Sequence, residues 1–160
     1  SFSDMFFGFI PGCVGETSKL AILIGAVLLI ATGIASWKIM LSTVAGALCT
    51  GLLLNAVAPP DPASYLNIPA WYHLVMGGFA FGAVFMATDP VTSAQTEKGK
   101  WIYGFLIGVI VIIIRAFNPG YPEGMMLSIL LMNTFAPLID HYVVQSNIKK
   151  RLKRAAVIVK

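Results

Sequence analysis

The stretch LAILIGAVLLIATGIASWKIMLSTVAGALCTGLLLNAVA, residues 20–58, contains a single charged residue, Lys38. A helix needs about 20 predominantly apolar residues to cross a bilayer. Lys38 divides the stretch into two runs of roughly that length, Leu20–Trp37 and Ile39–Ala58. Because lipid offers no hydrogen-bond partners, and because the runs do not alternate as barrel strands do, helices are favoured. The stretch therefore predicts two transmembrane helices.

Composition extends this prediction to all 160 residues. Hydrophobic residues make up 58% of the chain and charged residues 11%, against about 25% charged in a typical soluble domain. So few charges do not cover a water-facing surface, which excludes a soluble globular domain. Two cysteines, Cys13 and Cys49, do not make a disulfide framework and are expected to pack as small residues. The chain opens on Ser1 rather than Met, so we expect a piece of a longer protein.

Three further apolar segments complete an all-α integral membrane fold of about five spans. A short apolar stretch broken by proline and glycine comes before the first span and is expected to be re-entrant or interfacial. We therefore divide the chain into a segment 1–19, a five-helix transmembrane domain 20–146 and a basic tail 147–160. The three further spans are about Ala70–Thr88, Trp101–Ile114 and about Gly124–Ser146.

The distribution of cations predicts the orientation. With the C-terminal tail in the cytoplasm, alternating spans place Lys38, Lys98, Lys100 and all six tail cations on the cytoplasmic side. Only Lys19 and Arg115 fall on the other side. This follows the positive-inside rule, so the first residues are expected to be external. A basic tail beside a membrane helix is typical of a topology signal, and no nucleic-acid partner is expected.

The third predicted span carries the densest chemical signal. Phe81 and Phe85 are four residues apart, so both rings project from one helix face, where they could close a passage or simply fill the core or face lipid. Thr88 and Asp89 place hard oxygen ligands at the end of the span, where Pro90 frees carbonyl groups. Broken helices with freed carbonyls coordinate Na⁺ or protons in transporters. The alternative is an ordinary capped helix end.

Asp140 lies well inside the fifth predicted span, three residues after Pro137. A carboxylate at the centre of a membrane costs roughly 2.5–3.5 kcal/mol on insertion scales. It is therefore interpreted as an ion site or part of a proton relay. The alternative is that the helix ends near Pro137 and leaves Asp140 at the cytoplasmic interface.

The sequence around Glu16, Thr17 and Ser18 has two interpretations. Thr17 or Ser18 would make an ordinary N-cap for the first span, or the three residues line a cofactor or ion route. The pairs Gly78/Gly82 and Gly104/Gly108 have the spacing that lets membrane helices approach closely. The sequence contains no HExxH, CxxC or Walker motif, which gives no support for a transition-metal or nucleotide site.

Four long motifs resemble one family. The segments 11–23 (PGCVGETSKLAIL), 77–93 (GGFAFGAVFMATDPVTS), 118–133 (NPGYPEGMMLSILLMN) and 135–145 (FAPLIDHYVVQ) look like the B subunit of the bacterial Na⁺-translocating NADH:quinone oxidoreductase. The resemblance covers essentially the whole chain. The related D subunit of the Rnf electron-transport complex shares the MATDPVTS stretch.

The resemblance implies a membrane subunit of about ten helices in two inverted five-helix halves, of which this chain would be the second. It implies a riboflavin and an FMN joined to a threonine in an Asp-Gly-x-Ser-Gly-Ala-Thr motif, which is absent here and expected upstream. Quinone-site residues are likewise expected in the other half. Phe81 and Phe85 match a phenylalanine pair at a sodium constriction, and Asp140 matches an acidic residue of sodium uptake. Asp89 falls in the MATDP segment.

We therefore predict a fragment of a redox-driven sodium pump in the bacterial inner membrane, assembled with other subunits and inactive alone. Its part would be to line the sodium pathway, with Na⁺ near Asp140 and Phe81. The main alternative is half of a passive channel or transporter for urea, ammonium or another small solute. A membrane scaffold for complex assembly is a third possibility.

Overall fold

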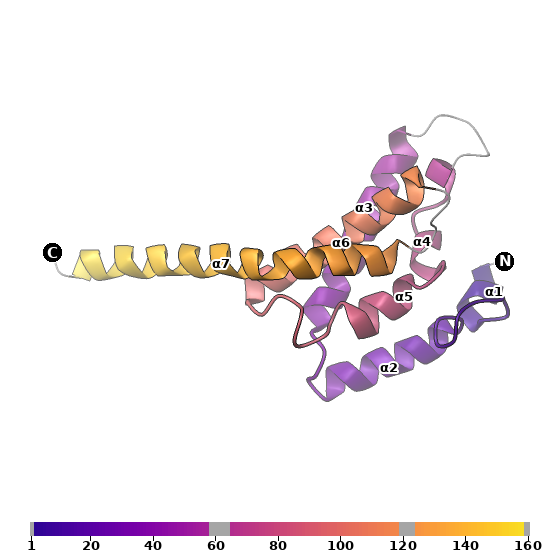
Figure 1. Ribbon diagram of the computed structural model, residues 1–160, viewed down its shortest axis with the longest axis horizontal. Coiled ribbons are helices and arrows are strands. Elements are labelled where there is room, and N and C mark those ends of the chain that lie inside the picture. The colour runs from indigo at the N-terminus through magenta and orange to yellow at the C-terminus, as the bar shows by residue number, and fades with distance from the viewer. Residues whose placement is uncertain (1, 58–64, 119–123, 159–160) are drawn as a thin grey trace.

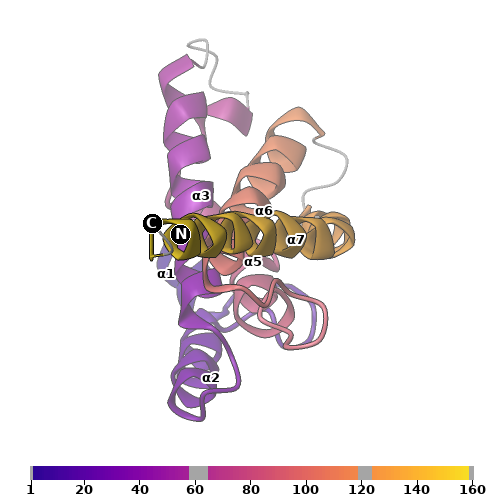
Figure 2. The same ribbon diagram turned by 90° about the vertical axis from the view of Figure 1, so that its left-hand side faces the viewer.

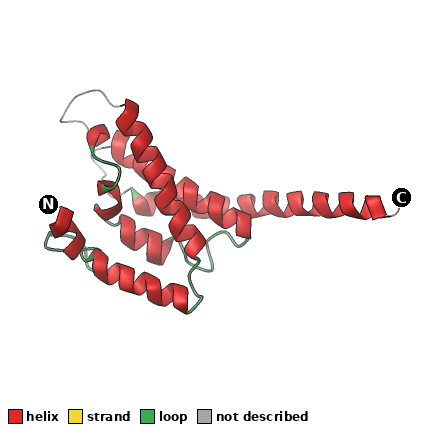
Figure 3. Ribbon diagram, turned by 180° about the vertical axis from the view of Figure 1, so that it is seen from behind, coloured by secondary structure: helices red, strands yellow, loops and turns green. Residues whose placement is uncertain are grey.

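The computed structural model describes residues 2–57, 65–118 and 124–158. Every regular element in these ranges is helical, as Figure 3 shows, which confirms the predicted all-α class. Figure 1 places the N-terminus at the right and the C-terminus, after α7, at the left. They are α1 (Phe2–Phe7), α2 (Lys19–Ala31), α3 (Trp37–Val57), η1 (Tyr65–Asn67), α4 (Tyr72–Val75), α5 (Phe79–Phe81), the π-helical turn η2 (Gly82–Met86), α6 (Glu97–Phe117) and α7 (Met125–Ile158).

Three helices are long and apolar enough to cross a membrane: α3, α6 and residues 125–155 of α7. The first predicted span, Leu20–Trp37, instead forms α2, whose 13 residues extend about 20 Å at the helical rise. The third predicted span, 70–88, is divided among α4, α5 and η2. The predicted membrane character is thus confirmed for three segments, and the other two form shorter helices.

Helices α3 and α6 run parallel and in close contact. Gly104 lies against Ser42, Gly46 against the Phe105 carbonyl and Gly108 against the Gly46 backbone, and a Cβ atom at any of these glycines would overlap its neighbour. Both helices begin at the same end of the molecule, where Lys38 pairs with Glu97 and the rings of Trp37 and Trp101 meet edge to face at 5.9 Å. The close approach predicted from Gly104 and Gly108 is confirmed.

The apolar core takes residues from α3, α5, η2, α6 and the first half of α7. Tyr103, Ile107 and Val111 are completely buried along one face of α6, and the Phe79 ring of α5 is almost so. From α7 the core takes Met125, Ile129, Met132 and Ala136.

Helix α7 is longer than a membrane span requires. Its 34 residues pass through Pro137 without ending, so the helix end considered near Pro137 is wrong. Gly124, just before α7, lies against Ile114 near the end of α6, whereas Asp140 bonds to Thr96 at the start of α6. The two helices are therefore antiparallel over residues 125–140. The predicted basic tail then continues as helix to Ile158, well past the rest of the molecule (Figures 1 and 3).

The α3–α6 contact gives a first prediction. We expect Gly46→Leu to lower the unfolding free energy of the full-length protein by about 3 kcal/mol or more, the upper end of the cost of overpacking, because the new side chain overlaps the Phe105 carbonyl. Cys49→Leu adds a similar bulk on the exposed side of α3 and is expected to be tolerated. The apparent melting temperature of the purified protein measures both. Equal melting temperatures for the two variants would contradict the packing.

Candidate functional site

The third predicted span is broken at residues 76–78, upstream of the break expected at Pro90. Helix α4 ends at Val75, Met76 is extended with ψ 138°, and Gly77 has φ +54°. A positive φ is readily adopted only by glycine, so Gly77 makes this turn possible. Helix α5 starts again at Phe79. The break leaves carbonyl groups without helical partners.

Two buried cations bind these carbonyl groups. The ammonium group of Lys19 donates to the Gly77 carbonyl at 2.9 Å and also to the Glu16 carbonyl. Arg115 donates from Nη1 to the His73 carbonyl at 2.8 Å and from Nη2 to the Met76 carbonyl at 3.0 Å. Both side chains are only 4% exposed. The break is thus held from α2 on one side and from α6 on the other.

Phe81 and Phe85 share one face, as their spacing predicts. Their ring centroids lie 5.1 Å apart. Gly15 lies against the Phe81 ring, and a Cβ atom at Gly25 of α2 would come within 2.6 Å of the Phe85 ring. The pair therefore faces α2 and the turn that precedes it. Phe81 is half-buried, and Phe85 is exposed in this chain.

Thr88 and Asp89 close the end of the third segment through local hydrogen bonds. The Thr88 hydroxyl donates to the Val84 carbonyl at 2.6 Å. The Asp89 carboxylate accepts from the Thr92 backbone N–H at 3.0 Å and from its hydroxyl at 2.7 Å. The hydroxyl bond is the largest cause that lowers the pKa of Asp89, so this group stays ionised at neutral pH. This geometry is that of an ordinary capped helix end, the alternative that the sequence analysis left open beside an ion site.

Asp140 caps the beginning of α6. Its carboxylate accepts from the Gln95 N–H at 2.7 Å, the Thr96 N–H at 3.0 Å and the Thr96 hydroxyl at 2.6 Å. Thr96 is itself the N-cap of α6 and accepts from the Gly99 N–H. A Cβ atom at Gly99 would come within 2.6 Å of the Asp140 carboxylate, so glycine makes room for it. The positive end of the helix dipole lies at the same point.

Sequence reasoning missed a buried polar pair between α6 and α7. The Tyr103 hydroxyl donates to the Asn133 side-chain carbonyl at 2.5 Å, and Tyr103 is completely buried. Asn133 precedes Asp140 by about two turns of α7. A second polar contact between α6 and α7 thus lies farther along the two helices from the Asp140 cap, and its sequence signal is an asparagine in an apolar run.

The residues predicted as cofactor or ion lining lie at the other side of the break. Ser18 is the N-cap of α2, accepting from the Ala21 N–H. The Glu16 carboxylate packs against Gly78, and Thr17 packs against Gly12. Glu16 and Thr17 line a cavity of about 320 Å³ beside the break, together with Ile10, Pro11, Gly12, Cys13, Lys19, Met76 and Gly77.

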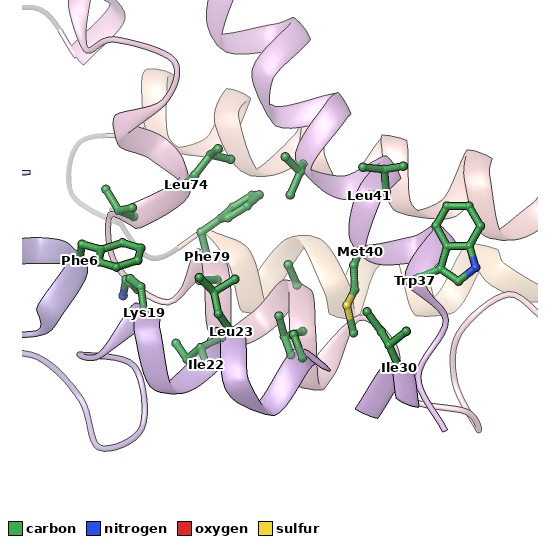
Figure 4. Close-up of a pocket in the computed structure, with 16 residues that line it drawn as sticks. Phe6, Lys19, Ile22, Leu23, Ile30, Trp37, Met40, Leu41, Leu74 and Phe79 are labelled. Atoms are coloured by element: carbon green, nitrogen blue, oxygen red, sulfur yellow. The ribbon is translucent and has the colours of Figure 1, made fainter. Parts of the chain in front are cut away.

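One apolar cavity does not suit a flavin. This cavity, of about 470 Å³, is lined almost entirely by apolar side chains, most of them from α2, α3, α5 and η2, with Lys19 as its one charged lining residue (Figure 4). A flavin presents several polar atoms that need partners. The sequence also lacks Ser-Gly-Ala-Thr. Within the described residues there is likewise no group of three or more His, Cys, Asp or Glu side chains that could hold a metal.

Comparison with known proteins places the chain in a family. The model of the NQR2, RnfD, RnfE family matches residues 1–149. The chain belongs to this family. It is 56% identical over 98% of its length to the Na(+)-translocating NADH-quinone reductase B subunit of Chromohalobacter salexigens, of which it spans 38%. Identity to the subunits of the same name is 53% over 94% of the chain in Pseudomonas aeruginosa PAO1 and 51% over 96% in Klebsiella pneumoniae 342. The chain spans little more than a third of these relatives.

The structure of this chain brings some of the predicted site residues together and keeps others apart. Asp140 meets the start of α6, whereas the Asp89 carboxylate bonds to Thr92. Phe81 and Phe85 contact α2 and the turn before it. Asp140 accepts its hydrogen bonds from residues 95 and 96. Among the described residues, these bonds do not involve the phenylalanine pair. The contacts of the phenylalanine pair and the hydrogen bonds of Asp140 thus involve different residues.

The buried lysine gives a second prediction. Lys19→Met removes the charged donor to the Gly77 carbonyl, and a hydrogen bond from a charged group contributes about 1.5–3 kcal/mol. We expect a lower melting temperature of the full-length protein. Lys98→Met, which changes an exposed lysine, is the control and is expected to have little effect. Equal melting temperatures for the two variants would show that Lys19 does not stabilise the break.

The cap on α6 gives a third prediction. A double-mutant cycle of Asp140→Ala and Thr96→Ala is expected to show a coupling free energy of about 0.5–3 kcal/mol, because the two side chains share a hydrogen bond. Thermal unfolding of the full-length protein and its three variants measures this energy. Additive effects of the two substitutions would show that the bond contributes nothing to stability.

Proposed function

We propose that this chain is part of the B subunit of a Na⁺-translocating NADH:quinone reductase and lines part of its sodium pathway. The observation that carries the proposal is 51–56% identity to subunits of that name over almost the whole chain. In this role the chain acts within a multisubunit complex that passes electrons from NADH to quinone. Moving one Na⁺ against 100 mV takes roughly 2.3 kcal/mol, which the electron transfer supplies.

The carboxylates at the start of α6 are the proposed entry region for Na⁺. Asp140 and Asp89 supply negative charge at the end of α6 where the cations Lys38 and Lys100 also lie. From there the Tyr103–Asn133 pair continues the polar region between α6 and α7. Hard oxygen atoms of this kind suit a small monovalent cation.

The broken segment has a different proposed role. Lys19 and Arg115 already bind the carbonyl groups of the break. These carbonyls are therefore assigned to holding the shape of the segment rather than to coordinating Na⁺. Phe81 and Phe85 follow the break directly, so a small movement there would displace both rings. This supports the proposal that the pair forms a constriction, with Glu16 to Ser18 lining the route on its far side.

The full protein is proposed to have about ten helices in two inverted halves, of which this chain is the second. An FMN and a riboflavin are proposed to lie outside the residues described here, and the quinone site is proposed to lie in the other half. Within this chain, we keep the division into residues 1–19, a five-span domain 20–146 and the tail 147–160. The C-terminus is proposed to be cytoplasmic and the first residues periplasmic, in the bacterial inner membrane. A passive solute channel would not explain the redox activity in the relatives' names.

The sodium pathway gives a fourth prediction. In the assembled complex, Asp140→Asn is expected to raise the Na⁺ concentration that half-saturates quinone reduction about tenfold, a loss of about 1.4 kcal/mol. Thr96→Ala weakens the same cap but keeps the carboxylate, so it is expected to leave this concentration unchanged. Equal effects of the two variants would show that Asp140 acts only on the fold.

Phe81→Ala is tested in the same assay, where we expect it to reduce the stimulation by Na⁺ because it removes one ring of the pair. Phe105→Ala removes a similar ring from an exposed face of α6 and serves as its control. Unchanged sodium stimulation in Phe81→Ala would exclude the constriction.

A further inference from the structure

The last part of α7 extends beyond the helices that it packs against. Residues 125–140 lie along α6, and Asp140 is level with the α6 N-terminus. Trp37 and Trp101 lie at this same end, as aromatic residues do at a membrane interface. The remaining residues to Ile158 add about 27 Å of helix past this level. Figures 1 and 3 show this extension projecting clear of the rest of the molecule.

Residues 144–155 of this extension, here called the basic segment, form a two-faced helix. Val144, Ile148 and Leu152 repeat every four residues and lie on one face, where they are 45%, 45% and 64% exposed. Positive side chains occupy the other face, and one surface hollow there is lined by Lys149, Lys150 and Lys153. By helical periodicity, Arg154 joins these lysines and Arg151 lies at the boundary.

The charge of the basic segment is all of one sign. Five cations fall within residues 149–154, and residues 141–160 contain no Asp or Glu. Any counter-charge must therefore come from outside the segment. An apolar stripe opposite a cationic face is typical of a helix that lies in the interface of an anionic membrane.

The direction of α7 fits this arrangement. Figure 2 looks almost along α7 while α3 runs across the view, so α7 is steeply inclined to α3 and passes along α6 at a slant. If α3 crosses the bilayer, α7 does not leave along the α3 direction into the aqueous phase. It leaves inclined toward the membrane surface, and the basic segment starts only four residues beyond Asp140, about 6 Å along the helix.

We propose that the basic segment is a binding site for anionic phospholipid headgroups. The stripe of Val144, Ile148 and Leu152 enters the boundary between headgroups and acyl chains. Lys149, Lys150, Lys153 and Arg154 bind lipid phosphates on the same membrane surface. This inference requires a membrane-embedded chain and does not depend on the proposed sodium pathway.

Spin labels on the two faces of the basic segment test the proposal. The assembled complex is prepared with a single label at Leu152→Cys or at Lys150→Cys, with its other reactive cysteines replaced, in nanodiscs that contain phosphatidylglycerol. Electron paramagnetic resonance measures collision with oxygen, which enters lipid, and with a water-soluble nickel chelate. We expect the Leu152 label to favour oxygen several-fold more than the Lys150 label does. In nanodiscs of phosphatidylcholine alone, this contrast is expected to fall.

Three outcomes would overturn the proposal. Equal access of the nickel chelate to both labels in phosphatidylglycerol would place the segment free in water. Shielding of both labels from both reagents would place it against an acidic protein partner. Replacing Lys149, Lys150 and Lys153 with Gln in the Leu152-labelled complex is expected to reduce its oxygen preference, whereas Lys98→Gln, outside the segment, should leave it unchanged. An unchanged preference in the triple variant would exclude phosphate binding by these lysines.

Discussion

The carbonyl groups freed between α4 and α5 impose the constraint on which the rest of the structure depends. A broken helix at membrane depth is tolerated only when its backbone is satisfied within the protein. Lys19 and Arg115 meet this need from two different helices, and each is almost completely buried in doing so. The same bonds therefore fix α2 and α6 relative to the broken segment. The phenylalanine pair takes its position from that arrangement, because Phe81 and Phe85 follow the break directly.

Close packing of α3 and α6 supplies the rigid part of the molecule. Glycine at positions 46, 104 and 108 lets the two backbones touch, so that van der Waals contact replaces the hydrophobic driving force that lipid does not provide. With α6 fixed in this way, its N-terminus becomes a defined place for a carboxylate. Asp140 reaches it from α7, and the buried Tyr103–Asn133 pair joins the same two helices farther in. The polar region is thus built on the most rigid pair of helices.

Sequence reasoning predicted the features that depend on local composition. Apolar length identified α3, α6 and α7 as membrane helices, and glycine spacing identified the close contact at Gly104 and Gly108. Features that depend on distant residues were not predicted. The partner of Asp140 is 44 residues away, and the bond from Lys19 to Gly77 spans 58 residues. The hydropathy pattern placed Lys19 as a charged residue at the boundary of the first predicted span. In the structure Lys19 is buried, because the break lies beside it.

Pro137 shows why a local rule failed. Proline removes one N–H donor and usually bends or ends a helix, yet α7 continues for about six more turns. In a membrane helix the freed backbone is compensated by neighbouring helices, and here the flanking residues Ala136 and Asp140 both contact α5–α6 partners through the core and the α6 cap. The tertiary contacts of α7 therefore outweigh the preference of a single residue.

Capping of α6 and binding of a cation by Asp140 are compatible roles, and their combination has a physical consequence. An ionised carboxylate offers about four lone-pair sites, and three hydrogen bonds from residues 95 and 96 already use most of them. A Na⁺ at this carboxylate would compete for the same oxygen atoms. It would therefore weaken the bonds that hold the start of α6 against α7. Occupancy of the ion site and the contact between these two helices are then linked through one side chain.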